Sequence, residues 1–169
     1  VKIGIDEIRA RDGAGLKLND DTGNGIFIKD GGNVGIGINN PTTKLAIQGT
    51  ASANIVQTTQ ISFLERSQNS STSMTVNWST ATHQKITNAL TSGTITVSFT
   101  NPSLSSNLVT NLILIIKHTG SGASIEFPNS VKWPGGVAPV ITGVAGSADI
   151  ISFYYSDGVY YGNVSFDYY

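Results

Sequence analysis

Carboxylates and histidines are the side chains of this sequence that could do chemistry, because pairs of them carry out hydrolysis and general acid–base catalysis. After residue 55 the carboxylates are widely spaced along the chain, at Glu65, Glu126, Asp149, Asp157 and Asp167. Hydrolysis of a polysaccharide needs two carboxylates several ångströms apart. Asp157 is accounted for by the turn that Asp157-Gly158 predicts. We therefore expect no catalytic residues and no enzyme activity.

The two histidines give no better indication of catalysis. His83 and His118 each stand alone, and no Gly-x-Ser-x-Gly sequence accompanies the abundant serines. A serine-hydrolase elbow requires that sequence. A metal site built from alternate residues of a strand requires two histidines close together. Neither chemistry is predicted.

Two glycine-containing stretches resemble ligand loops only in part. Asp20-Asp21-Thr22-Gly23-Asn24-Gly25 begins like a calcium loop, but Gly31 stands where an EF-hand needs a bidentate glutamate. Gly35-x-Gly37 is followed by Asn39-Asn40-Pro41, which prevents the helix that a dinucleotide site requires. We expect no metal ion and no cofactor.

The overall charge excludes further classes. The chain has 10 basic and 11 acidic residues and a net charge of −1, so it lacks the basic surface of a nucleic-acid-binding protein. The longest apolar run, Leu112–Ile116, is too short for membrane insertion. There are no cysteines, and therefore no disulfides. Because the chain begins at Val1, we expect it to be part of a longer protein whose missing segment is N-terminal.

Short period-two segments, each followed by turn residues, are the elements of the first fifty residues. The apolar members are Ile3/Ile5, Leu16/Leu18, Ile26/Ile28, Val34/Ile36/Ile38 and Leu45/Ile47. Glycines such as Gly13, Gly23, Gly31 and Gly37 occur at the joints. Acidic residues such as Asp6 and Asp12 are read as turn and edge residues. The pattern predicts a series of very short strands.

Such strands are too poor in apolar side chains to close a core within one chain. The simplest solution is three identical chains wound around one axis, with the aliphatic side chains directed inward and strand edges paired between chains. A single-chain β-solenoid is the alternative, but it needs a more regular repeat and more length. We therefore expect a fibrous trimeric β-shaft over residues 1–55.

The same region carries a family resemblance. Gly32-Asn33-Val34-Gly35-Ile36-Gly37, followed by Asn40-Pro41-Thr42-Thr43-Lys44-Leu45, resembles a motif that recurs in bacteriophage tail fibres and tailspikes. In that family the segment forms intertwined trimeric β-structure in the fibre shaft. The resemblance implies a homotrimer joined to upstream fibre segments and located in the virion, at the tip of a tail fibre. No self-cleaving chaperone domain, which follows the motif in many relatives, is recognisable in residues 51–169.

Residues 56–72 are read as a connector that includes one strand at most, and residues 73–169 as a globular head. Longer alternating segments and the apolar run Leu112–Ile116, which fits a central strand, predict a β-sandwich of jelly-roll type. Val131-Lys132-Trp133-Pro134-Gly135-Gly136 resembles the C-terminal domains of tail fibres that end in a tyrosine-rich hairpin. The whole chain is thus expected to be all-β.

Aromatic side chains concentrate near the C-terminus, and an aromatic face flanked by hydroxyls and amides binds neutral sugars. We expect packing roles for Trp133 and Phe153. The residues expected to contact a receptor are Tyr155, Tyr160, Tyr161, Tyr168 and Tyr169. The resemblance implies an adhesin for a host-surface polysaccharide or outer-membrane receptor. A purely architectural fibre segment is the alternative, and a polysaccharide-degrading tailspike is a third.

Overall fold

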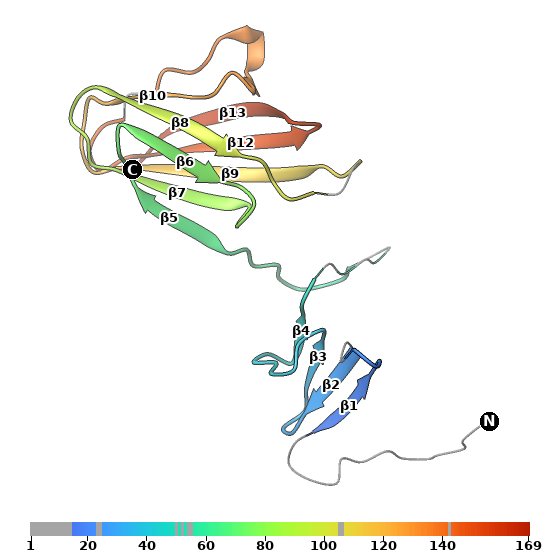
Figure 1. The fold of residues 1–169 in the computed structure, drawn as a ribbon. Coiled ribbons are helices and arrows are strands. Elements are labelled where there is room, and N and C mark those ends of the chain that lie inside the picture. The colour runs from blue at the N-terminus through green and yellow to red at the C-terminus, as the bar shows by residue number, and fades with distance from the viewer. Residues whose placement is uncertain are drawn as a thin grey trace. The chain divides into compact units, whose positions relative to one another are not determined.

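The computed structural model describes residues 15–22, 25–49, 51, 53, 56–104, 107–141 and 143–169. The expected strand at Ile3/Ile5, the turn residues Asp6, Asp12, Gly13 and Gly23, and Ile55 lie outside these residues. The chain divides into two units, residues 1–59 and 60–169, and Figure 1 shows their strands.

The protein is all-β, as the sequence predicts. Its described strands are connected by loops and one short 3₁₀ turn, Pro134–Gly136. No helix in the described part of the chain is long and apolar enough to span a membrane.

The N-terminal unit contains a four-stranded sheet in the order β1-β2-β3-β4. Its strands coincide with four of the expected short segments: β1 (Leu16–Asn19), β2 (Gly25–Lys29), β3 (Asn33–Ile36) and β4 (Leu45–Ile47). The first three strands are antiparallel, and β4 runs parallel to β3. The central strands therefore find backbone partners on both sides within one chain.

The glycine-rich motif makes the sharp return from β3 to β4. A side chain at Gly35 would place its Cβ 2.2 Å from the carbonyl oxygen of Ile38, so only glycine fits there. The Asn33 side chain donates a hydrogen bond to the carbonyl oxygen of Pro41, and the Val34 amide donates to that of Lys44. These contacts fold the loop back so that β4 lies beside β3.

The C-terminal unit has two sheets. The three-stranded sheet has the order β10-β8-β6, and the six-stranded sheet has the order β11-β13-β12-β9-β7-β5. The strands are β5 (Glu65–Asn69), β6 (Ser73–Asn77), β7 (His83–Asn88), β8 (Thr94–Thr100), β9 (Thr110–His118), β10 (Ser124–Glu126), β11 (Val131–Lys132), β12 (Ala148–Ser156) and β13 (Val159–Tyr168). Strand β5 lies inside the expected connector, residues 56–72, and belongs to this unit.

From β5 to β10 the chain winds as a coil between the two sheets. Successive strands alternate between the sheets, and neighbours within each sheet run parallel: β5, β7 and β9 in one, β6, β8 and β10 in the other. The expected jelly-roll topology is therefore wrong, because a jelly roll is antiparallel. Antiparallel pairing is confined here to β9, β12 and β13.

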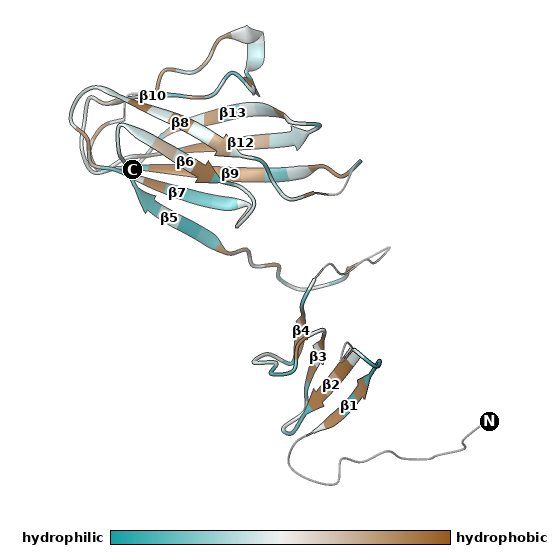
Figure 2. Cartoon of the chain, viewed as in Figure 1, coloured by the Kyte–Doolittle hydropathy of each residue, from teal (hydrophilic) through white to brown (hydrophobic). Residues whose placement is uncertain are grey.

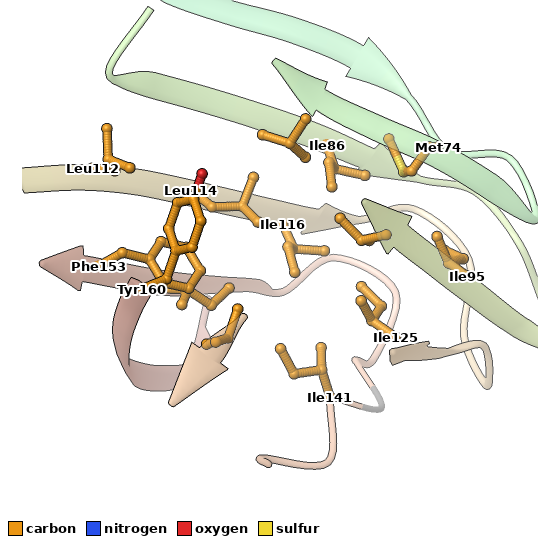
Figure 3. Packing of buried hydrophobic residues seen from close by; sticks show 14 of the residues in the cluster. Met74, Ile86, Ile95, Leu112, Leu114, Ile116, Ile125, Ile141, Phe153 and Tyr160 are labelled. Carbon is orange, nitrogen blue, oxygen red and sulfur yellow. The ribbon is translucent and has the colours of Figure 1, made fainter. Parts of the chain in front are cut away.

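One hydrophobic core lies between the two sheets (Figure 3). The alternating residues of each strand direct Val76, Ile95 and Val97 from one sheet toward Leu114, Ile116 and Ile151 of the other. Aromatic rings fill one end, with Phe99 in edge contact with Trp78, Phe127, Phe153 and Tyr160. The expected packing roles of Phe153 and Trp133 are confirmed, since Phe153 is buried and Trp133 packs against this core.

A tight hairpin joins the last two strands. Asp157 and Gly158 have φ of 49° and 81°, as the Asp-Gly pair predicts for a type I′ turn. The turn fixes the register, so that Tyr155 pairs with Tyr160 and Tyr154 with Tyr161. On the inner side of β13, Gly162 has no side chain and the Trp133 ring occupies the space, 2.6 Å from where a Cβ would lie.

Candidate functional site

One face of the N-terminal sheet carries only aliphatic side chains. Residues directly opposite one another in a sheet share a face, and the register gives two rows: Leu16, Ile28, Val34, Leu45, and Leu18, Ile26, Ile36, Ile47. We call these eight residues the aliphatic face. Most of them are exposed, and Figure 2 shows the apolar character of these strands.

The opposite face of this sheet is buried only at its centre, and Lys17 and Asn19 on it are exposed. Phe27 is buried there, beside Gly35 and Ala46, and the ammonium group of Lys17 lies 5.3 Å from the centre of its ring. The sheet thus has one mixed face with a buried aromatic ring at its centre and one aliphatic face, most of whose side chains are exposed. An exposed apolar patch of this kind is typical of an interaction surface.

The expected receptor-binding tyrosines do not form one site. Tyr155 and Tyr160 point inward and are buried, so their assignment to a receptor surface is wrong. Tyr161 is exposed on the outer face, at the hairpin end of the six-stranded sheet. Tyr168 and Tyr169 are exposed at the opposite end, where Tyr168 pairs with Ala148. Seven residues of strand separate Tyr161 from Tyr168, about 23 Å.

Burial explains the role of Tyr160. Its hydroxyl donates a hydrogen bond to the Asn101 side-chain oxygen at 2.9 Å. Burial, and secondarily the neighbouring Tyr155, raise the pKa of the Tyr160 hydroxyl far above its usual range. The hydroxyl therefore stays protonated in the folded protein at pH values that ionise a tyrosine in the unfolded chain.

A Tyr160→Phe substitution tests this burial. At pH 7 it is expected to lower the free energy of unfolding by about 1 kcal/mol, because the hydrogen bond to Asn101 is lost. Above about pH 10 the unfolded wild-type chain ionises at this tyrosine and the folded one does not. Wild-type stability therefore falls, and the difference between the two proteins shrinks. Urea denaturation at pH 7 and between pH 10 and 11.5 measures both effects. A constant difference across that range would contradict the argument.

Tyr154 was not among the residues expected to contact a receptor, but it has the exposed position that we expected for Tyr155 and Tyr160. It is exposed on the outer face, and its ring centre lies 6.3 Å from that of Tyr161. The register places Asn111 of β9 beside Tyr154, and Lys132 of β11 beside Tyr161. We call Asn111, Tyr154, Tyr161 and Lys132 the tyrosine row. This pairing of Tyr154 with Tyr161 could have been predicted from the sequence, because the Asp157-Gly158 turn sets the register and the strand alternation sets the face.

The remaining acidic residues have structural partners or lie apart. The ammonium group of Lys85 contacts the Glu65 carboxylate on the outer face of the six-stranded sheet. Asp149 is buried: one carboxylate oxygen lies 2.9 Å from His118 Nε2, and the other accepts a hydrogen bond from the Asp167 amide. Asp149 and Asp167 both line a hollow of about 200 Å³, but both Asp149 oxygens are already engaged.

No group of three or more acidic residues, histidines or cysteines that could hold a metal ion is present among the described residues. No protein-family model matches the chain, and neither a curated protein nor a solved structure matches it. Two surfaces of the chain bear on its function, the aliphatic face and the tyrosine row.

Proposed function

We propose that the chain is the distal part of a bacteriophage tail fibre, a homotrimeric adhesin in which residues 1–55 form the shaft and the C-terminal unit recognises a polysaccharide of the host surface. The observation that carries the proposal is the aliphatic face. It occurs within the segment that resembles the fibre motif, and it gives each chain a surface that identical copies can cover around a common axis.

The physical reason for self-association is the amount of apolar surface involved. Covering the exposed part of an aliphatic side chain contributes on the order of 1 kcal/mol, and the aliphatic face has eight of them. The face contains no charged side chain, so three copies can approach one axis without electrostatic repulsion. Upstream fibre segments would continue the same axis.

The adhesin role is supported by the tyrosine row. Two exposed aromatic rings, an amide and an ammonium group lie side by side on one face of a rigid sheet. Aromatic faces flanked by hydrogen-bonding groups suit sugar rings. Three copies in a trimer would let individually weak sites hold a cell surface together.

The test combines assembly and binding. Light scattering should give a solution mass about three times the 17.8 kDa of the chain, and the protein should bind a subset of arrayed bacterial surface polysaccharides. Deleting the last hairpin would disrupt the six-stranded sheet, because β12 lies between β9 and β13. Point substitutions are used instead, and Tyr154→Ala with Tyr161→Ala should lower the binding. A monomer contradicts the shaft. A trimer that binds no polysaccharide and does not adhere to cells supports an architectural segment instead.

A further inference from the structure

Two hollows lie next to each other at the end of the six-stranded sheet that also carries the tyrosine row. One, of about 380 Å³, is lined by Phe63, Thr82, His83, Thr110, Asn111 and Ile113. The other, of about 220 Å³, is lined among others by Trp78, Ser79, Thr80, Thr82 and Thr110. Thr82 and Thr110 belong to both, so they form a shared rim. We call them the paired hollows.

The larger hollow contains a preformed aromatic platform. The Phe63 ring is stacked on the His83 ring, with centres 4.7 Å apart and planes 13° from parallel. Phe63 is nevertheless 60% exposed, so much of its surface remains accessible. The Thr82 hydroxyl lies 3.1 Å from His83 Nδ1 and holds the histidine in turn. An exposed ring that is already fixed loses little freedom when a ligand stacks on it.

The smaller hollow is bordered by a buried donor without a partner. The indole N–H of Trp78 has no hydrogen-bond partner among the described residues, although Trp78 is only 2% exposed. A buried donor of this kind costs about 1–3 kcal/mol unless something accepts its hydrogen.

The lining identifies the class of ligand. Among the described residues that line the two hollows there is no lysine, arginine, aspartate or glutamate. Glu65, which pairs with His83 in the sheet, has its carboxylate in contact with the Lys85 ammonium group. Aromatic rings, hydroxyls and one amide suit an uncharged molecule with many hydroxyl groups. Two adjoining hollows suit a chain of such units better than a single unit.

We propose that the paired hollows bind two consecutive units of a neutral oligosaccharide, with Phe63 as the stacking platform. This site rests on the proposed function, because it is part of the same adhesin. Asn111 belongs both to the larger hollow and to the tyrosine row. The glycan therefore continues from the hollows across the strands toward Tyr154 and Tyr161. The site takes an internal stretch of a polysaccharide rather than one terminal sugar.

The test uses the full chain and an array of neutral oligosaccharides of one to five units, with uronic-acid and sialic-acid oligosaccharides alongside. We expect neutral chains to bind, with at least tenfold tighter binding for chains of two or more units than for single sugars. Phe63→Ala and Asn111→Ala should each weaken binding by about tenfold. Phe166→Ala, which removes an exposed ring at the other end of β13, should leave it unchanged. Thermal melting confirms that each variant is folded.

Four results would overturn this inference. In the first, the Phe63 and Asn111 variants bind as the wild type does, while the Tyr154 and Tyr161 variants lose binding. The glycan then binds outside the paired hollows, and the proposed adhesin function is retained. Binding of acidic chains only shows that the class of glycan is wrong. If Phe63→Ala changes the solution mass, the hollow is an interface between copies. Absence of binding to every glycan, with no adhesion to cells, refutes the proposed function as well.

Discussion

Replacing Ile26 with aspartate is expected to convert the proposed trimer into monomers. Ile26 lies on the central strand β2, directly between Leu18 and Ile36 on the aliphatic face. An unpaired carboxylate in a buried interface costs several kcal/mol, and three copies would face one another at a common axis. Since each 1.4 kcal/mol is a factor of ten, dissociation should increase by at least about a thousandfold. Light scattering at micromolar concentration measures the mass.

Asn19→Asp is the matched control for this experiment. Asn19 is exposed in β1 and its side chain lies on the opposite face from Leu18, so the substitution adds the same charge where no partner chain is expected. It should keep the trimer. A trimer that survives Ile26→Asp would show that the aliphatic face does not mediate assembly. A wild-type dimer would refute threefold symmetry while retaining the face as an interface.

The short strands of the N-terminal unit were predictable from the sequence because they depend on local patterns. Period-two alternation located Leu16, Leu18, Ile26 and Ile28, and glycines marked the turns between them. The pairing of β3 with β4 was not predictable, because the loop between them is held by specific contacts such as that of Asn33 with Pro41. The aliphatic face follows only once this register is known.

The topology of the C-terminal unit could not be predicted for a related reason. Alternation shows that Val76 and Val97 face a core, but it does not say which sheet each strand joins. A coil between two sheets and a jelly roll have the same strand pattern in sequence and differ in strand direction. Tyr160 was assigned to the wrong face for the same reason. The sequence does not show which face of the last hairpin is turned toward the core, and the aromatic cluster around Phe99 shows that Tyr160 belongs to it.

The site was predictable only in part. The tyrosine-rich hairpin was found, and its turn contains the information that pairs Tyr154 with Tyr161. Phe63 was read as an apolar residue of a connector, because nothing local shows that its ring lies on His83 twenty residues later. The paired hollows bring together loops before β5, β7 and β9. Sites assembled from such distant segments depend on tertiary packing, which no local pattern encodes.

Removing the Asp149 carboxylate is expected to produce the largest loss of stability in the C-terminal unit. Asp149 is 1% exposed and connects His118 Nε2 to the amide of Asp167, both at 2.9 Å. In Asp149→Ala both donors lose their partner inside the protein, and each unsatisfied buried group costs about 1–3 kcal/mol. We therefore expect the free energy of unfolding to fall by about 3 kcal/mol or more, measured by urea denaturation at pH 7.

The conservative variant Asp149→Asn separates hydrogen bonding from shape. Asn88 Nδ2 lies 3.3 Å from His118 Nδ1, and Asn88 Oδ1 accepts the Leu90 amide. This fixes the amide nitrogen of Asn88 toward the ring, so His118 accepts at Nδ1 and donates from Nε2. An asparagine at 149 that still accepts the Asp167 amide presents its NH₂ group to that Nε2–H, and two donors then face each other. Asp149→Asn should therefore cost nearly as much as Asp149→Ala.

Glu126→Gln serves as the control, because it neutralises an exposed carboxylate on β10 and should change the free energy of unfolding by no more than about 0.5 kcal/mol. A loss below about 1 kcal/mol in Asp149→Asn would show that His118 can reverse its donor and acceptor nitrogens in place. That reversal would need room for the Asn88 amide to rotate. The Leu90 amide opposes it, because it donates to Asn88 Oδ1 and would face the Asn88 NH₂ group after the rotation.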